Sequence, residues 1–521
     1  MGILFAFLDM STNKWTLAVV VIIVFAFLLT FLNDIYTIYI KGLPPGPWSL
    51  PIVGGLYMLS PRQPHISMEK FIQKYGKIFT VQFGFIGPTV FICDPDLPYK
   101  VYSQHLPDRP PLPVFKYLNG SDEGIGSIHY SHSHKQLRRM CLQAMNGIGM
   151  ASTQEHTNKA FKIFFQNVTT GHPVDPTVDI RKMCTALFAS YIYGLSYKTF
   201  DDPVLTQLHH NQQVTVSVLF PAHPFNILPW TIHVPCKWAK QLKTAVKERN
   251  ATLQTQYRLL DTPCRDLNIH HAVLGKMAAM RLKDPNKPST EAIKMSCWTQ
   301  EVAGMSTTFN AMQWLMLYLA VHSDVQDRAL ALINTAVPAH RLPTLADKPH
   351  LPYIEAIVME VLRIAPPVPL GIPHTSLQHT VKVGSYTLPK GTMVLCNIWH
   401  IHHNEKYWKE PNTFQPDRFI DNNGKCIPHH KLKHFLPFGH GKRSCVGEKF
   451  AQNILFLFTC ALLICTDLTI EDSEIPDMNG FVTLGLEPFP HKLHISLCKH
   501  VDLNELFPEN NSTSSSDKKT N

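Results

Sequence analysis

The amino-acid sequence predicts one large, mainly α-helical globular domain behind an apolar N-terminal helix. Apolar side chains recur three and four residues apart over residues 301–320 and 353–364, and an apolar run follows Gly447. This spacing is typical of helices that pack into a core. The chain has 521 residues, is 45% hydrophobic and carries its motifs in a single order without repeats, so it can bury one large core.

The N-terminal region, residues 1–33, is expected to hold a membrane anchor. Residues 15–32 form a nearly continuous apolar run without a charged side chain, and a helix of about 18 residues just suffices to span a bilayer. Leu43-Pro44-Pro45-Gly46-Pro47 then predicts a stiff, proline-rich hinge over residues 34–50, ahead of a globular domain over 51–503. A buried core helix and a cleaved signal peptide are the alternatives, but no small-residue cleavage site is evident.

Two further features of composition limit the possible functions. The net charge is +9, yet no nucleic-acid-binding motif accompanies it, so nucleic acid is not an expected partner. The C-terminal residues 504–521 are polar and are predicted to form a disordered tail.

Residues 438–447, Phe-Gly-His-Gly-Lys-Arg-Ser-Cys-Val-Gly, place one cysteine in a glycine-rich loop. Gly439 and Gly441 permit backbone conformations that a side chain forbids, and Gly447 is expected to do the same. Arg443 supplies a cation that lowers the pKa of a nearby thiol, and the start of the following helix favours an anion. Most free cysteines are simply buried, but this combination favours Cys445 as a metal-binding thiolate.

The pattern Phe-Gly-x-Gly-x-Arg-x-Cys-x-Gly resembles the cysteine loop of the cytochrome P-450 family, the haem-thiolate monooxygenases. The resemblance extends over nearly the whole chain to the microsomal group that includes steroid hydroxylases and xenobiotic oxidases. It implies an α+β fold that is mainly α with smaller β-sheets, haem b with Cys445 as the iron ligand, and O2 as a co-substrate. It also implies that Phe438 and Gly439 contact the cofactor.

A second motif supports the resemblance. Glu360 and Arg363 share one face of a predicted helix. The segment Phe-Gln-Pro-Asp-Arg-Phe at 414–419 resembles the Pro-Glu-Arg-Phe segment of the family, with Asp417 in place of Glu. In the family these residues form a buried charged network that locks the cysteine loop, so the resemblance gives this role to Glu360, Arg363 and Arg418.

Five residues match positions that bind the haem propionates. Residues 134–139 resemble the Trp-x-x-x-Arg helix of the family, with Arg138 at the arginine and His134 in place of the aromatic residue. A histidine on a basic surface helix is the alternative for His134. Arg109, His374 and Arg443 match propionate-binding residues of the microsomal members.

Residues 303–308, Ala-Gly-Met-Ser-Thr-Thr, resemble the oxygen-activating segment Ala-Gly-x-Asp/Glu-Thr-Thr. Thr307 falls at the threonine that delivers protons, whereas Ser306 stands where the family has an acid. A serine can orient water but cannot relay protons as an acid with a pKa near 4 does. Either water and Thr307 carry the proton, or the enzyme is an isomerase or dehydratase that rearranges a preoxidised substrate without external electrons. Glu301 lies roughly 140° around the helix from Ser306 and is the alternative acid that could replace the one missing at Ser306.

The resemblance also implies the substrate and the partners. It favours a lipophilic substrate such as a steroid, a fatty acid or a xenobiotic, although a haem-binding sensor without turnover is a further alternative. Electrons would come from NADPH through the flavoprotein cytochrome P-450 reductase, with cytochrome b5 as a second candidate partner. The catalytic domain would face the cytosol on the endoplasmic reticulum membrane.

Pocket candidates are Phe115, Phe220, Phe225, Leu370, Ile372 and Phe481, with core packing as the alternative for each. Basic candidates for reductase docking are Lys135, Arg138, Arg139, Lys431, Lys433, Lys442 and Lys449.

Overall fold

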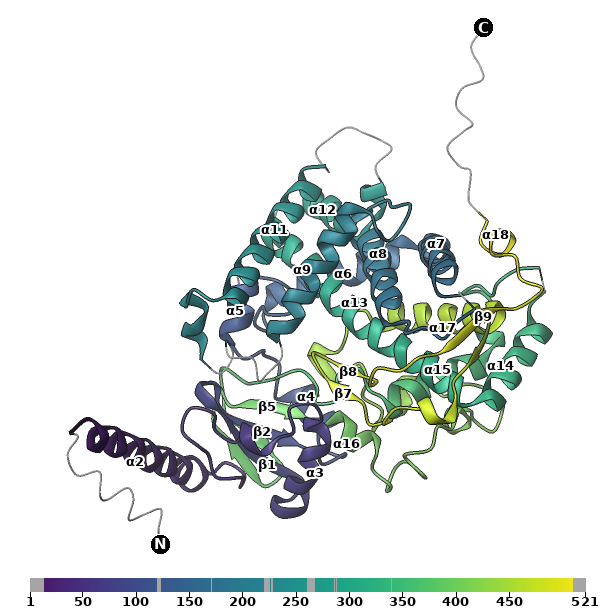
Figure 1. Ribbon diagram of the computed structural model, residues 1–521. Helices are drawn as coiled ribbons and strands as arrows, with labels where there is room; N and C mark the ends of the chain where they lie inside the picture. The colour runs from purple at the N-terminus through teal and green to yellow at the C-terminus, as the bar shows by residue number, and fades with distance from the viewer. Residues whose placement is uncertain are drawn as a thin grey trace.

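The computed structural model describes residues 14–508 except 120–122, 170, 220–224, 226–227, 260–267, 285, 287 and 339. A large helical lobe and a smaller β-rich lobe lie side by side, and a separate N-terminal helix projects from the β-rich lobe (Figure 1). The predicted fold class, mainly α with smaller sheets, is confirmed.

The helical lobe surrounds the long helix α13 (Thr290–Val321). The side chain of Ser289 caps this helix by accepting a hydrogen bond from the backbone N–H of Ala292, and apolar residues occur all around the helix, as expected for one with neighbours on every side. The other helices of this lobe are α5 (Pro113–Asn119), α6 (His132–Ile148), α7 (Met150–Val168), α8 (Thr177–Tyr193), α9 (Pro203–Leu219), α11 (Lys237–Leu259), α12 (Val273–Lys283), α14 (Ser323–Ala336), α15 (Pro352–Ile364) and α17 (Glu448–Cys465).

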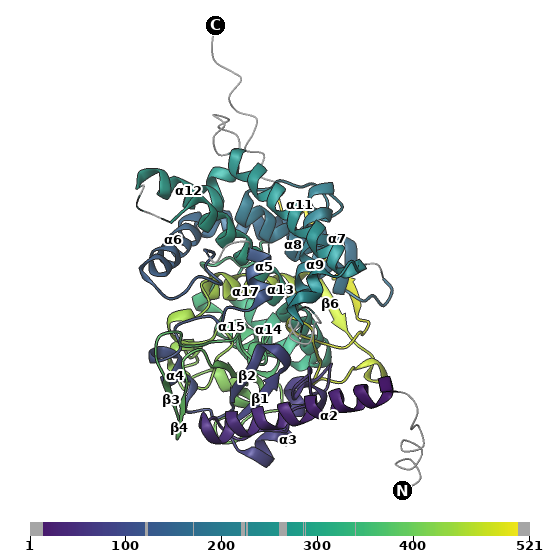
Figure 2. The same cartoon turned by 90° about the vertical axis from the view of Figure 1, so that its left-hand side faces the viewer.

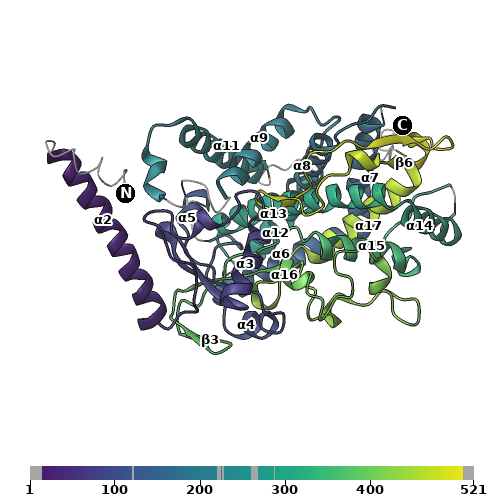
Figure 3. The same ribbon diagram turned by 60° about the horizontal axis from the view of Figure 1, so that its bottom comes forward.

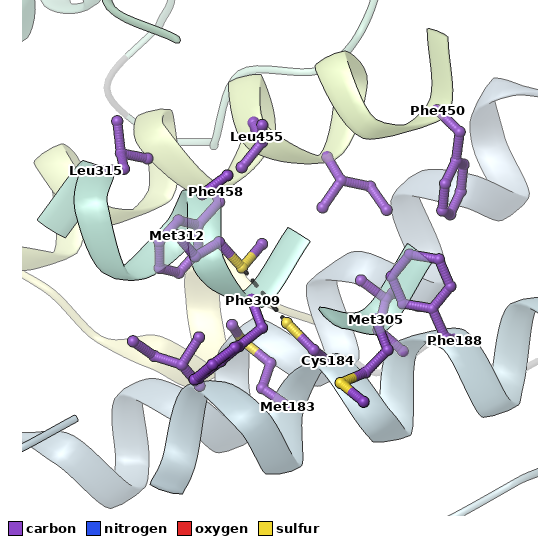
Figure 4. Packing of buried hydrophobic residues seen from close by; sticks show 14 of the residues in the cluster. Met183, Cys184, Phe188, Met305, Phe309, Met312, Leu315, Phe450, Leu455 and Phe458 are labelled. Carbon is purple, nitrogen blue, oxygen red and sulfur yellow. Dashed lines mark hydrogen bonds between the residues drawn. The ribbon is translucent and has the colours of Figure 1, made fainter. Parts of the chain in front are cut away.

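Helices α8, α13 and α17 form the centre of the main core (Figure 4). Phe188 of α8 packs edge to face against Phe450 of α17, with ring centroids 5.6 Å apart. The thiol of Cys184 lies 3.7 Å from the thioether sulfur of Met312 in the same cluster. Such dense apolar packing fixes the three helices against one another and makes the wall of the site rigid.

The β-rich lobe contains the three-stranded sheet β1-β2-β5. Strands β1 (Ile78–Phe83) and β2 (Gly87–Ile92) pair antiparallel, and β5 (Met393–Cys396) joins β2 in parallel. Helices α3 (Pro64–Tyr75), α4 (Pro98–Gln104) and α16 (Ile398–His402) flank it. The small two-stranded sheets are β3 (Val381–Val383) with β4 (Tyr386–Leu388), β6 (Thr466–Thr469) with β9 (His494–Leu497), and β7 (Phe481–Val482) with β8 (Leu486–Glu487).

Helix α2 (Lys14–Ile35) stands apart from the body in Figure 3 and passes in front of the β-rich lobe in Figure 2. Within the described residues, Leu17–Ile38 is long and apolar enough to span a membrane and is almost fully exposed, as a candidate anchor should be. Glu448–Cys465 passes the same test, but it is largely buried in the core.

The hinge region is tied to the end of α2. The carboxylate of Asp34 accepts hydrogen bonds from the backbone N–H (2.7 Å) and the hydroxyl (2.9 Å) of Ser49. At the other end of the chain, α18 (Leu503–Leu506) and the buried Phe507 pack near α7, so residues 504–508 of the expected tail are ordered here. Residues 509–521 lie outside the described residues.

Candidate functional site

A cavity of about 280 Å³ lies between α13 and the loop that carries Cys445, because residues of both line it. Most of α13 is buried, but Ala303, Gly304 and Thr307 are accessible where the cavity meets the helix. Thr307 and Cys445 therefore line one shared cavity, although they are far apart in the sequence.

The cysteine loop adopts conformations that require glycine. Gly439 and Gly441 have φ angles of 66° and 78°. A Cβ atom on Gly441 would lie 2.3 Å from the carbonyl oxygen of Tyr102, so the loop packs directly on the backbone of α4. Gly447 has an ordinary φ of −91°, and the expectation of a special conformation at this position is wrong. The backbone N–H of Cys445 donates to the carbonyl of Phe438 (2.9 Å) and closes the loop.

The surroundings of the Cys445 sulfur act on its pKa in opposite directions. Burial raises the pKa of the thiol above its ordinary value, while the backbone N–H groups of Gly447 and Glu448 at the start of α17 lower it. The charge of Arg138 also lowers the pKa of the thiol. Arg138 donates to the carbonyl (2.7 Å) and the hydroxyl (3.0 Å) of Ser444 and thereby joins α6 to the loop.

Arg443 and Arg109 lie together at another edge of the cavity and bond to backbone carbonyls. Arg443 donates to Pro107 (2.8 Å), and Arg109 donates to Pro373 (2.8 Å). Burial lowers the pKa of Arg109 to about 9 and that of Arg443 to about 10, and the charge of Arg443 contributes to the shift at Arg109. Two buried guanidinium groups at one edge of the cavity favour an anionic ligand there.

Two histidines lie near these arginines. His134 is buried, and its Nδ1 has no hydrogen-bond partner. Burial and the charges of Arg443, Arg138 and Arg109 lower the pKa of His134 to about 3. His374 bonds through Nδ1 to the carbonyl of Leu106 (2.9 Å) and stacks on the ring of Tyr102.

These residues fit a haem group in their chemistry. A cysteine sulfur lines the cavity, guanidinium groups stand at its edge, and the unpaired Nδ1 of His134 lies among them. Two carboxylates placed at this edge would supply the missing negative charge, and a thiolate would supply a ligand for iron. Of the residues expected to bind the cofactor, six line this cavity: Arg109, His374, Phe438, Gly439, Arg443 and Cys445. Arg138 and His134 do not line it, and Arg138 is connected to it through Ser444 of the cysteine loop.

The structure also brings Glu360, Arg363 and Arg418 together. The Glu360 carboxylate accepts hydrogen bonds from Arg363 (2.7 and 2.8 Å), from Arg418 (3.0 Å) and from the backbone N–H of Gln415 (2.9 Å). Glu360 and Arg363 are fully buried. Asp417 takes no part, because it forms a two-pronged pair with Arg328 nearer the surface.

The polar residues of α13 point in different directions. The hydroxyl of Thr307 donates to the carbonyl of Ala303 (2.8 Å) and lies at the cavity. Ser306 donates to the carbonyl of Val302 (2.8 Å), and it does not line the cavity. Glu301 points toward α8 and α9, where it accepts hydrogen bonds from Tyr193 and Gln212, so it does not replace the missing acid beside Thr307.

The substrate-pocket candidates are scattered. Ile372 lines the cavity, whereas Phe115, Leu370 and Phe481 are partly buried elsewhere and Phe225 packs against Tyr117. Phe220 lies outside the described residues. Four residues of α6, α8 and α13 that line the cavity were not predicted from the sequence, because their helical spacing is also that of ordinary core residues. They are Met145, Phe188, Ile192 and Gln300.

Comparisons with known proteins identify the family of the chain. The family model described as Cytochrome P450 matches residues 44–495. Cytochrome P450 2J3 of Rattus norvegicus is 28% identical over 87% of this chain and 91% of its own, and the steroid 17-alpha-hydroxylase/17,20 lyase of Ovis aries is 29% identical over 88% and 92%. A zebra fish cytochrome P450 with progesterone superimposes with a TM-score of 0.71 at 25% identity, over 84% of this chain and 99% of that one.

The match of the family model covers most of the chain and includes both the cysteine loop and the segment of α13 that faces it. Members of this family carry haem on a cysteine thiolate and use O2. The chain belongs to the cytochrome P450 family and is an oxidoreductase of the monooxygenase class.

Proposed function

We propose that the protein is a membrane-bound monooxygenase that inserts one atom of O2 into a lipophilic substrate, with electrons from NADPH delivered by a flavoprotein reductase. The observation that carries this proposal is the single cavity shared by Cys445 and Thr307. Its wall is mostly apolar, with contributions from Phe188, Ile192 and Ile372, and an apolar wall binds lipophilic molecules by excluding water.

Each residue at the cavity has a proposed role in holding the cofactor. Cys445 is the iron ligand, and Phe438 and Gly439 shape the loop against the ring. Arg109, Arg138, Arg443, His134 and His374 bind the two propionates. His374 donates from Nδ1 to a backbone carbonyl, and burial and the charge of Arg109 hold the pKa of its ring well below the ordinary value. It would donate from Nε2 to a carboxylate only where the negative charge of that carboxylate restores the second proton. When bound, haem supplies the iron at which O2 is activated.

Thr307 is the proposed proton donor on the side of α13. Its hydroxyl holds its proton toward the carbonyl of Ala303 and can rotate to donate into the cavity. Ser306 keeps its proton on the helix backbone, so water has to reload Thr307. This arrangement favours turnover with some loss of reducing equivalents, because no carboxyl side chain of α13 stands beside Thr307.

Membrane and partner contacts follow from two surfaces. The exposed apolar helix α2 is the proposed single-pass anchor in the endoplasmic reticulum, with the catalytic domain in the cytosol. Basic residues lie beside the cysteine loop. Helix α6, which is bonded to Ser444 of the loop, carries the exposed Lys135 and Arg139. We assign this basic face to an acidic reductase, with cytochrome b5 as the second candidate.

The test is product analysis under isotopically labelled O2 with purified protein, reductase, NADPH and a panel of steroids, fatty acids and planar aromatics. One labelled oxygen atom in a product supports the proposal and identifies the substrate class. Product formation without NADPH and without label would contradict it and favour the isomerase instead.

A further inference from the structure

His402 ends helix α16 and lies between the charged network of α15 and the cysteine loop. Its side chain is fully buried. The backbone N–H of Leu436 donates to Nε2 (2.8 Å), and Nδ1 donates to the carbonyl oxygen of Arg363 (3.0 Å). An N–H can act only as donor and a carbonyl only as acceptor, so these two partners fix a neutral ring with its proton on Nδ1.

The electrostatic surroundings agree with a neutral ring. Burial lowers the pKa of His402 well below its ordinary value, and the charges of Arg363, His403 and His429 act in the same direction. A stacked ring, Phe435, covers one side of the imidazole with centroids 5.6 Å apart. The ring therefore keeps one orientation and one tautomer.

On the side of α15, two hydrogen bonds run in opposite directions between the same two residues. Arg363 donates through Nη1 to the carbonyl of His402 (2.8 Å), while the His402 ring donates to the carbonyl of Arg363. Arg363 is also bonded to Glu360 through Nε and Nη2. The position of the imidazole is thus set by the charged network.

On the other side, Leu436 begins the cysteine loop. The backbone N–H of Gly439 donates to the carbonyl of Leu436 (3.0 Å), and the N–H of Cys445 donates to the carbonyl of Phe438 (2.9 Å). A short series of hydrogen bonds therefore connects Glu360 with the backbone that presents the sulfur, and His402 is the side chain that crosses from one element to the other.

We propose that His402 is a positioning residue: its ring, held through Nδ1 by the carbonyl of Arg363, accepts at Nε2 from the backbone N–H of Leu436 and thereby fixes the loop from which Cys445 reaches the cavity. This proposal rests on the proposed role of Cys445 as the haem ligand. The competing explanation is an ordinary core histidine, whose loss lowers stability without affecting the geometry of the sulfur.

Two amide variants of different length separate these explanations. The amide oxygen of Gln in His402→Gln falls near the position of Nε2 and can accept from Leu436, whereas Asn in His402→Asn falls near Nδ1 and cannot. His400→Gln is the matched control, because His400 is on the same helix and bonds to Glu69 (2.8 Å) away from the loop. All variants are made in the full chain.

The first readout is amide hydrogen exchange of Leu436 in the haem-free protein. We expect His402→Asn to accelerate it about tenfold, the equivalent of one lost hydrogen bond, and His402→Gln to leave it within roughly twofold of wild type. The second readout is the carbon monoxide spectrum of the reduced, haem-loaded protein. There His402→Asn should lose most of the absorption band of thiolate ligation, while His402→Gln and His400→Gln keep it.

Equal behaviour of the Gln and Asn variants, either both damaged or both intact, would overturn the proposal. If His402→Asn does not fold, the His402→Gln variant is the test. A folded His402→Gln protein without the thiolate band would then overturn the proposal. A wild-type protein that binds haem without this band would instead contradict the proposed function, so the two failures are distinguishable.

Discussion

Two buried glutamates, Glu360 of α15 and Glu301 of α13, have opposite environments. Glu360 accepts from two guanidinium groups, those of Arg363 and Arg418, and from a backbone N–H. Glu301 is equally inaccessible, but its hydrogen-bond donors are the neutral side chains of Tyr193 and Gln212. The charge of the hydrogen-bond partners, rather than the degree of burial, therefore decides whether a buried carboxylate stays ionised or titrates.

The environment of Glu301 makes it a titratable group near neutral pH. Burial raises its pKa to about 7, and the hydrogen bonds from Gln212 and Tyr193 and the charge of Arg249 only partly oppose this shift. Glu360 instead acts as the anion that holds two cations beside the cysteine loop. We therefore expect one carboxylate to be indispensable for the site and the other to control stability through pH.

The largest effect is expected at Glu360. Glu360→Ala leaves Arg363 and Arg418 without their counter-charge, which costs about 3 to 5 kcal/mol for a buried pair. We expect loss of haem incorporation and a sharply lower Tm, measured by haem content and calorimetry. Asp417→Asn is the control, because the pair with Arg328 is about half exposed and such pairs contribute ~1 kcal/mol or less. A purified Glu360→Ala protein with normal haem content would refute this role.

The second effect is the pH dependence caused by Glu301. The unfolded chain releases this proton near pH 4.5, and the folded protein releases it near pH 7. The folded state therefore binds more protons between these two pH values. The contribution of Glu301 to the free energy of unfolding is greatest at or below pH 4.5, and it falls by ~3 kcal/mol as the pH rises to 7. Urea unfolding at several pH values should show this slope in wild type and a flatter one in Glu301→Gln. If Glu301→Gln has the same dependence of unfolding free energy on pH as wild type, Glu301 is not the cause of that dependence.

A third effect concerns the helix that carries Glu301. A Cβ on Gly304 would lie 2.2 Å from the ring of Phe188, which lines the cavity and packs on Phe450. Gly304→Ala should therefore destabilise the protein by about 1 to 3 kcal/mol, despite the better helix propensity of Ala. Gly147→Ala on α6 is the control, since its Cβ would meet only the flexible chain of Lys276 at 3.4 Å. Equal Tm values for both variants would show that Phe188 can move freely.

The smallest effect is expected at Ser306. Because its hydroxyl bonds to the backbone of α13, Ser306→Ala should leave the coupling of NADPH to product within about twofold of wild type. Thr307→Ala should reduce coupling roughly tenfold or more, since it removes the proposed proton donor at the cavity. Comparable losses in the two variants would instead show that Ser306 takes part in catalysis.

These sites differ in how far the sequence alone predicted them. The cysteine loop and the Glu360–Arg363 pair were predictable because glycine conformation and helical spacing are local properties. The direction of Glu301 was not, since it depends on α9 supplying Gln212 from a distant part of the chain. The same holds for His402, which resembles any other histidine of a His-rich segment until Arg363 and Leu436 are placed beside it.

The substrate pocket was the least predictable part. Apolar residues in the expected segments are equally suited to the core, and the structure distributes Phe115, Leu370 and Phe481 among partly buried positions away from the cavity. The helices that supply the wall, α6 and α8, show the periodicity of ordinary core helices. A cavity forms where packing is incomplete, which sequence patterns do not record.

The central claim, that Cys445 is the thiolate ligand of haem, is tested most directly by the carbon monoxide spectrum of the reduced protein. Two cysteines line the cavity, so Cys445→Ser and Cys396→Ser form a matched pair. We predict that Cys396→Ser keeps the band of thiolate ligation and Cys445→Ser loses it. Retention of that band in a folded, haem-loaded Cys445→Ser protein would contradict the account.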